Sequence, residues 1–187
     1  MSLRYNKKWA IETVRSEPRS KFVFFWSSKL RPDGVLTDAV FSQWASTPFQ
    51  DDTGQIFPTA EHFMMVAKAR LFGANHTATD ILSSESPGRA KALGRQIISF
   101  DQTIWEKKRE QIVLQGNMFK FTRNTHLADY ILRTGNKILV EASPIDPIWG
   151  IGLSSDDPAV RRPWDWKGEN LLGFALMEIR DTLRTSS

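Results

Sequence analysis

Short apolar runs separated by Gly, Pro and Asp organise the first third of the chain. The stretch from Phe22 to Trp26 is an unbroken aromatic and β-branched run, which predicts a buried strand. The stretch from Phe41 to Trp44 predicts a second short strand. The polar residues 51–54 are typical of a hairpin tip before an extended segment at 55–57. We therefore expect this part of the chain to supply small pieces of sheet.

From residue 59 onward the pattern becomes helical. Thr59 can N-cap a helix that continues to Phe72, and Ser86 precedes a proline that can open another helix. Asp101 can cap a long helix. The remaining predicted elements are a helix over 124–135, a strand over 138–142 and a last helix over 172–183. Because strands do not alternate regularly with helices, the pattern predicts an α+β fold, a mainly helical single domain with small β-sheet pieces.

Composition excludes several classes of protein. The chain has 187 residues, of which 41% are hydrophobic and 25% charged, as expected for one globular domain. It has no cysteine, which excludes disulfides, Cys-ligated zinc and thiol nucleophiles. The longest apolar runs have five residues and the N-terminus lacks an apolar signal core, so we expect no membrane association. The expected location is intracellular, either cytoplasmic or nuclear.

The formal net charge of +4 is unevenly distributed. Six Lys and Arg residues against two Glu residues lie within positions 1–21. We therefore divide the chain into a loosely packed basic tail, residues 1–20, and a domain, residues 21–187. Such a tail is either simply solvated or touches phosphate groups. Trp9 and Ile11 argue against loose packing, because they could anchor the segment on the domain.

Two pairs on predicted helices are candidates for chemistry. Glu61 and Lys68 share one helical face that also carries methionines. A carboxylate and an amine there are either a base and a nucleophile or a solvated ion pair. Trp105 and Arg109 stand one helical turn apart, and the plain interpretation is a core tryptophan beside a solvated arginine.

A third candidate lies in the loop that follows the strand at 138–142. Asp146 and Trp149 are three residues apart, so the acid can hold a ribose hydroxyl or a water and the indole can stack on a ring. Gly150 and Gly152 would let backbone amides approach a phosphate. The alternative is a tight turn in which the Asp side chain bonds its own backbone.

Several segments, in order along the chain, resemble the NADAR family, whose members are also called YbiA-like. The resemblance runs from about residue 22 to 184 and is carried by TAEHFMMVAKA (59–69), KALGR (91–95), GNMFKF (116–121), LRTG (132–135), LVEASPIDPIWGIGL (139–153) and WKGENLLGFALMEIR (166–180). It implies an N-glycosidase fold that acts on ribosyl compounds without a metal or a cofactor.

The resemblance also implies roles for individual residues. The family's acid falls on Glu61, and its aspartate and tryptophan fall on Asp146 and Trp149. A helix tryptophan falls on Trp105, and the lysine implicated in a Schiff base with the sugar falls on Lys68. The chemistry is then either an imine formed by the lysine or cleavage assisted by a carboxylate, and the division of acid and base between the two carboxylates stays open.

Two substrates are compatible with the resemblance. The chain is basic and not fused to a riboflavin enzyme, so we prefer removal of ADP-ribose from guanine in DNA. Early riboflavin-pathway intermediates and a non-catalytic ADP-ribose reader are the alternatives. The expected ligand is thus ADP-ribose or another phosphorylated ribosyl group, on nucleic acid where the preference holds, and the oligomeric state stays open. Ala45 and the charged loop 158–166 depart from the family pattern and bear on substrate choice.

Overall fold

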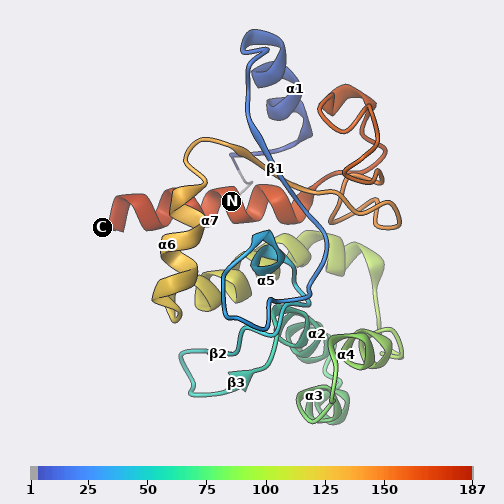
Figure 1. Ribbon diagram of the computed structural model, residues 1–187. Helices are drawn as coiled ribbons and strands as arrows, with labels where there is room; N and C mark the ends of the chain where they lie inside the picture. Colours follow the sequence, from blue (N-terminus) through green and yellow to red (C-terminus); the bar gives the residue numbers. More distant parts are fainter. Residues whose placement is uncertain (1–3, 187) are drawn as a thin grey trace. The chain divides into compact units, whose positions relative to one another are not determined.

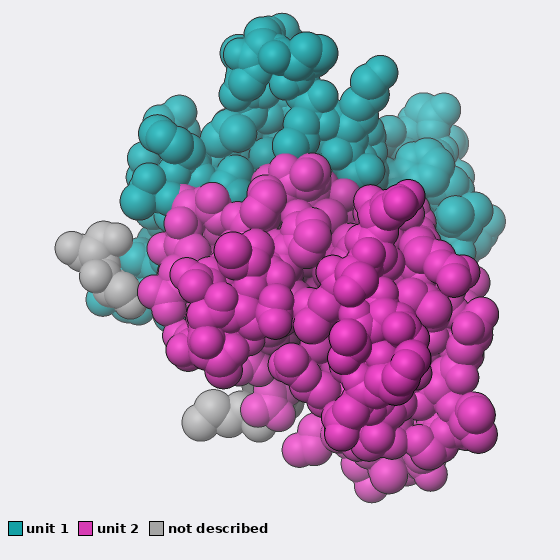
Figure 2. All heavy atoms as spheres, turned by 90° about the horizontal axis from the view of Figure 1, so that it is seen from below, with its two compact units in different colours: residues 1–42, 125–187 teal, residues 43–124 magenta. Residues whose placement is uncertain are grey.

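The computed structural model describes residues 4–186 (Figure 1). The chain forms two compact units, coloured separately in Figure 2. One unit comprises the described residues up to 42 together with those from 125 onward, and the other comprises residues 43–124. Helices dominate and the strands are few and short, so the predicted α+β class is confirmed. Among residues 4–186, no helix is long and apolar enough to cross a membrane.

The unit of residues 43–124 is a helical cluster with one hairpin. Strands β2 (Phe49–Gln50) and β3 (Ile56–Phe57) pair antiparallel around the predicted hairpin tip. The helices are α2 (Ala60–Leu71), α3 (Asn75–Leu82), α4 (Pro87–Gly94) and α5 (Gln102–Thr122). Sequence reasoning predicted all of these helices except α3. The three predicted N-caps are confirmed, because each accepts a backbone N–H in the first turn: Thr59, Ser86 and Asp101.

Helix α2 lies at the centre of this unit, against α3, α4 and α5. Helix α4 approaches it at Gly94, where an added Cβ would lie 2.3 Å from the sulfur of Met65. Helix α5 approaches it at Gly116, where a Cβ would lie 2.5 Å from the ring of Phe63. Neighbours on several sides explain why α2 buries even its charged residues.

The other unit is built on a two-stranded parallel sheet. Strand β1 (Phe22–Phe25) pairs in register with β4 (Ile138–Glu141), so that Phe22 lies beside Ile138. Helix α7 (Leu171–Ser186) packs on β4 and on α6 (Thr125–Arg133). The remaining elements are α1 (Lys7–Ser16) and the 3-10 turns η1 (Asp38–Phe41) and η2 (Pro163–Asp165).

The predicted strand from Phe41 to Trp44 is wrong. Its first residue ends the 3-10 turn η1, and the residues that follow form bends and turns. The ring of Phe41 packs edge-on against Phe25 at 5.6 Å, and its neighbours Ala39 and Val40 are buried with it. The apolar run therefore reflects burial of a tight turn, which a short apolar pattern does not distinguish from a strand.

The prediction that residues 1–20 pack loosely is also wrong for the part that the structure describes. Asn6 N-caps α1 by accepting the N–H of Trp9, and α1 buries Ala10 and Val14. The hydroxyl of Tyr5, just before the helix, donates to Asp181 of α7 over 2.5 Å. The segment is therefore a docked helix, anchored by a small apolar stripe within a mostly charged sequence.

Candidate active site

The side chain of Lys68 is held in a buried setting within residues 43–124. It is 9% exposed, and its amine donates a 2.8 Å hydrogen bond to the carbonyl of Gly94 at the end of α4. The rings of Phe100 and Trp105 lie 4.2 Å and 5.5 Å from the amine nitrogen, measured to the ring centres. The amine thus has one backbone acceptor and two aromatic faces around it.

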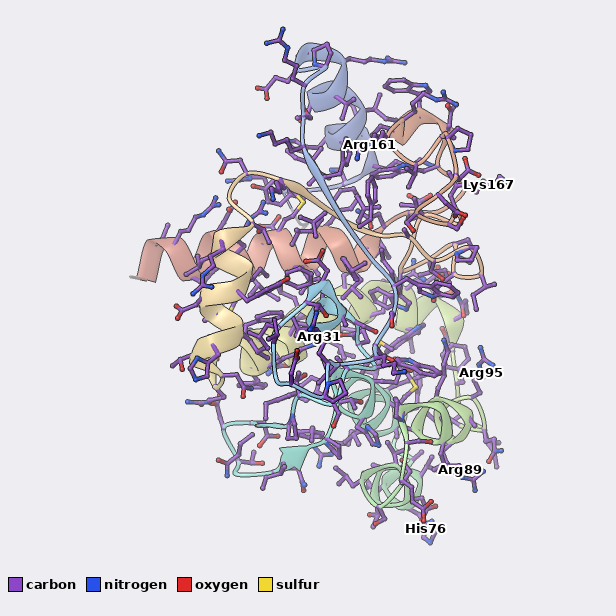
Figure 3. The ribbon with its side chains drawn as sticks, in the orientation of Figure 1. Arg31, His76, Arg89, Arg95, Arg161 and Lys167 are labelled. Carbon is purple, nitrogen blue, oxygen red and sulfur yellow. The ribbon has the colours of Figure 1, made fainter. Side chains whose placement is uncertain are left out.

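Burial lowers the pKa of Lys68 below its usual value, because an ammonium loses hydration there. The positive charge of Arg95 lowers the pKa further, and the carboxylate of Glu61 raises it. The aromatic faces favour the charged form as well. Figure 3 labels Arg95 just beyond the end of α4. Because the net effect is a lowered pKa, a larger fraction of Lys68 is the neutral, nucleophilic amine near neutral pH.

Glu61 occupies the first turn of α2 and is 2% exposed. Its backbone N–H donates to the carbonyl of Gln43 over 2.9 Å, which ties the start of α2 to the preceding segment. The N-terminal position suits a carboxylate, because the helix dipole is positive there. Since Glu61 and Lys68 are both buried, the solvated ion pair does not describe them.

Trp105 and Arg109 on α5 are not simply a core tryptophan beside a solvated arginine. Trp105 is 9% exposed and faces the amine of Lys68, so it is more than a core anchor. The Nε atom of Arg109 is buried and has no hydrogen-bond partner among the described residues. Arg109 is therefore not simply solvated. It offers an N–H that a ligand oxygen could accept.

His62 is the buried titratable residue beside Glu61, and both of its ring nitrogens have hydrogen-bond partners. Its Nδ1 lies 2.8 Å from the hydroxyl of Thr59, and its Nε2 lies 3.2 Å from the carbonyl of Ser84. Burial lowers the pKa of His62, which favours a neutral ring that donates from Nε2. The contact of Nδ1 stays within the start of α2, and that of Nε2 holds this start to the loop before α4. Within residues 4–186, no three His, Asp or Glu side chains gather as a metal site would require.

In the other unit, Asp146 forms the turn that the alternative interpretation described. Its Oδ1 accepts the backbone N–H groups of Ile148 and Trp149, both over 2.9 Å. Its Oδ2 accepts no hydrogen bond from the residues that the structure describes. The turn therefore uses one carboxylate oxygen and leaves the other available to a ligand.

The rest of this loop is joined to the start of α7 and to the residue just before it. The N–H of Leu172 donates to the carbonyl of Trp149 over 3.1 Å, and the N–H of Asn170 donates to that of Gly150 over 3.0 Å. A Cβ at Gly150 would lie 2.8 Å from the carbonyl oxygen of Glu141, so packing alone requires glycine there. Gly152 has a φ of +67°. The role of both glycines in holding a phosphate stays a prediction.

The predicted site residues thus fall into two groups. Glu61, Lys68 and Trp105 belong to residues 43–124, where the lysine interacts with both of the others. The second group shares one loop of the other unit and comprises Asp146, Trp149, Gly150 and Gly152. Sequence reasoning missed Phe100, since nothing in its local pattern shows that it faces an amine on α2.

Comparison with known proteins identifies the family of this chain. The family model described as the NADAR domain matches residues 24–184. N-glycosidase R617 of Acanthamoeba polyphaga mimivirus is 42% identical over 86% of this chain and 95% of its own length. N-glycosidase YbiA of Escherichia coli (strain K12) is 31% identical over 76% of this chain and 80% of its own length.

A solved structure agrees with the fold. The NMR structure of E. coli YbiA superimposes with a TM-score of 0.72 at 27% identity, covering 89% of this chain and 87% of that one. The names of the relatives support N-glycosidase activity as the broad class of function. With a family model that spans most of its length, this chain belongs to the NADAR family.

Proposed function

We propose that this chain is an N-glycosidase that removes ADP-ribose from ADP-ribosylated guanine in DNA. The observation that carries the proposal is the buried amine of Lys68, whose pKa is lowered, beside the indole of Trp105. Family membership supplies the reaction class, and the basic composition, with a net charge of +4, favours a polyanionic substrate.

The proposed chemistry uses the amine as a nucleophile. The nitrogen of Lys68 bonds to the anomeric carbon as the bond from that carbon to the base nitrogen breaks, and the base leaves with a proton from a carboxylic acid. The amine then loses a proton. The bond from the anomeric carbon to the ring oxygen breaks, the ring oxygen takes up a proton, and the opened sugar is held as a protonated imine. Water hydrolyses the imine, which restores the amine and releases the sugar.

The setting of Lys68 suits these steps. Its hydrogen bond to the neutral carbonyl of Gly94 orients the amine and leaves a lone pair for bonding. The buried carboxylate of Glu61 stabilises positive charge that develops on the sugar. We propose Glu61 and Asp146 as the groups that exchange protons with the base and with water.

Arg109 supports a phosphorylated substrate. A buried guanidinium N–H without an acceptor is unfavourable by about 1–3 kcal/mol, and the Nε of Arg109 is such a group among the described residues. Phosphate oxygens are strong acceptors for Arg. We therefore propose Arg109 as a donor to the diphosphate of ADP-ribose.

The test compares two substrates side by side. Purified protein is incubated with an oligonucleotide that carries ADP-ribosyl-guanine and, separately, with an early riboflavin-pathway intermediate. Released ADP-ribose, ribose 5-phosphate and free base are measured by mass spectrometry, with Lys68→Met as the matched control. We expect ADP-ribose release that the control lacks.

Other outcomes would replace the proposal. Cleavage of the riboflavin intermediate alone would assign the chain to that substrate. Tight binding of ADP-ribose with no release from either substrate would identify a reader rather than an enzyme.

A further inference from the structure

A large cavity among the described residues lies wholly within the unit that contains α1, α6 and α7. Its volume is about 1120 Å³, and this open cavity is lined by α1 with the residues on either side of it, by the turn between α6 and β4, and by α7. Sites for a single small molecule measure roughly 300–1,000 Å³. The cavity is therefore large for a single small ligand, and none of the predicted site residues lines it.

Cationic side chains dominate its lining. Seven Lys and Arg residues line the cavity, against the two carboxylates Glu17 and Asp181. Asp181 is already engaged, because Arg4 approaches it at 2.6 Å and Arg184 at 3.3 Å. The other five cations have no ion-pair partner within residues 4–186: Arg19, Lys21, Arg133, Lys137 and Arg180.

Arg180 gives the strongest indication of a bound anion, because it is a buried cation. It is 1% exposed, and its Nη1 donates to the hydroxyl of Thr134 over 2.9 Å and to the carbonyl of Lys137 over 2.7 Å. Its Nε is buried and has no acceptor among the described residues. A buried guanidinium without a carboxylate is costly unless an anion completes its surroundings.

A simpler explanation covers only part of this charge. Arg133 lies in the last turn of α6 and Arg184 in the last turn of α7, where cations complement the helix dipole. Arg19, Lys21 and Lys137 lie outside helices, so the dipole does not account for them. Their convergence on one cavity needs another reason.

Aromatic groups accompany the cations. Tyr5 and Trp9 both line the cavity, and their rings meet edge to face with centres 4.6 Å apart. Trp9 is half-buried, so part of its ring is open to a ligand. A cationic groove with aromatic side chains is the combination that binds single-stranded nucleic acid, through phosphate contacts and base stacking.

We propose that this cationic cavity binds the phosphate backbone of a nucleic-acid strand. The inference rests on the proposed function for the choice of nucleic acid and deepens it by assigning a binding surface. The five cations without an ion-pair partner come from three separate segments, which suits successive phosphates along a strand better than one isolated phosphate. Lys21, Arg133 and Lys137 make phosphate contacts, and Arg180 provides a fixed donor on the buried side.

The test measures binding of an unmodified, fluorescently labelled single-stranded oligonucleotide by anisotropy at several salt concentrations. The variant Lys21→Gln/Arg133→Gln/Lys137→Gln removes three cavity charges. A matched control, Lys29→Gln/Lys107→Gln/Lys108→Gln, removes three exposed charges that do not line the cavity. Deleting α1 would be less informative, because it would remove the buried residues that dock this helix.

We expect the cavity variant to bind at least about tenfold more weakly. The slope of log K against log salt concentration should become shallower by about two, since each single-strand phosphate contact contributes about 0.7 to that slope. The control should keep most of the affinity. Equal losses in both variants, or no binding by the unmodified protein at low salt, would overturn the proposal. Displacement of the oligonucleotide by equimolar pyrophosphate would identify a small-phosphate site instead.

Turnover of ADP-ribosylated guanosine, a small form of the proposed substrate, separates this inference from the proposed function. Both variants should cleave that compound as the unmodified protein does, because neither changes a proposed catalytic residue. If no protein cleaves it while the cavity variant alone loses DNA binding, the enzymatic proposal fails and the binding surface stands. If cleavage occurs and the variants bind DNA equally, the binding surface fails alone.

Discussion

The amine of Lys68 donates to the backbone carbonyl of Gly94 over 2.8 Å. A carbonyl is neutral, so it accepts a hydrogen bond from an ammonium and from a neutral amine alike. A carboxylate in its place would hold the charged form more strongly. This arrangement keeps the nitrogen in position while its charge changes, as a nucleophile that loses and regains a proton requires.

Lys68→Met is expected to reduce cleavage at least about 100-fold, a loss typical of removing a group that takes part in the chemistry. The variant keeps an unbranched chain on α2 and removes the amine, so the fold should persist. Single-turnover release of the base measures the effect, and circular dichroism checks the helices. Retained cleavage would remove Lys68 from the mechanism.

The imine itself can be trapped. Borohydride added during turnover should reduce it and add the mass of the opened sugar compound to the protein at Lys68. Lys68→Arg is the matched control, because it keeps a cation beside Trp105 but forms no imine. Cleavage by that variant, or no adduct on the unmodified protein, would favour assistance by a carboxylate over a covalent intermediate.

The pH dependence of cleavage should report the environment of Lys68. Because the neutral amine is the reactive form and its pKa is lowered, the rate should rise with pH and level off below the usual lysine value. Arg95 lowers this pKa through its charge, so Arg95→Gln should move the rise to higher pH. Arg95 is exposed, so the shift should shrink at high salt. An unchanged profile would contradict this assignment.

The local chemistry of the sequence predicted much of the fold. Thr59, Ser86 and Asp101 each cap the helix expected after it, because a cap depends only on residues within one turn. The pairing of β1 could not be predicted from local residues in this way. Strand β4 lies more than a hundred residues away, and no local pattern states that the two pair in parallel.

The sequence predicted that Glu61 and Lys68 lie near each other, but not what surrounds them. The family resemblance supplied Lys68 and Glu61, and helical spacing placed them on one face. Phe100 and the carbonyl of Gly94 approach the amine through packing of α4 and the segment before α5. The docked helix α1 was missed because Ala10 and Val14 form too short an apolar stripe among charged residues.

Two variants test separately whether Asp146 is needed for the turn and whether its charge is needed for cleavage. Asp146→Asn keeps an oxygen that can accept the N–H groups of Ile148 and Trp149, whereas Asp146→Ala removes that acceptor. We expect both variants to lose cleavage and only the alanine variant to lose stability, by about 1–2 kcal/mol. Urea unfolding and turnover measure the two effects. Full activity of Asp146→Asn would show that the residue serves the turn alone.

Lys120 should make stability depend on pH. It is fully buried on α5, and burial lowers its pKa to about 7. The unfolded lysine titrates near 10.4, so between about pH 7 and 10 the unfolded chain binds more protons than the folded one. The free energy of unfolding contributed by this residue therefore rises with pH across that window, by at most about 1.4 kcal/mol per pH unit.

Lys120→Met removes the titrating group and keeps a similar volume. We expect the variant to be stabilised relative to the unmodified protein most strongly below pH 7, where the lysine must be charged while buried, and the difference to shrink as pH approaches 10. Urea unfolding at pH 6, 8 and 9.5 measures it. Lys107→Met, an exposed position on the same helix, should show no such trend. A difference that does not change with pH would show that the folded and unfolded chain bind the same number of protons at Lys120, and would contradict the lowered pKa.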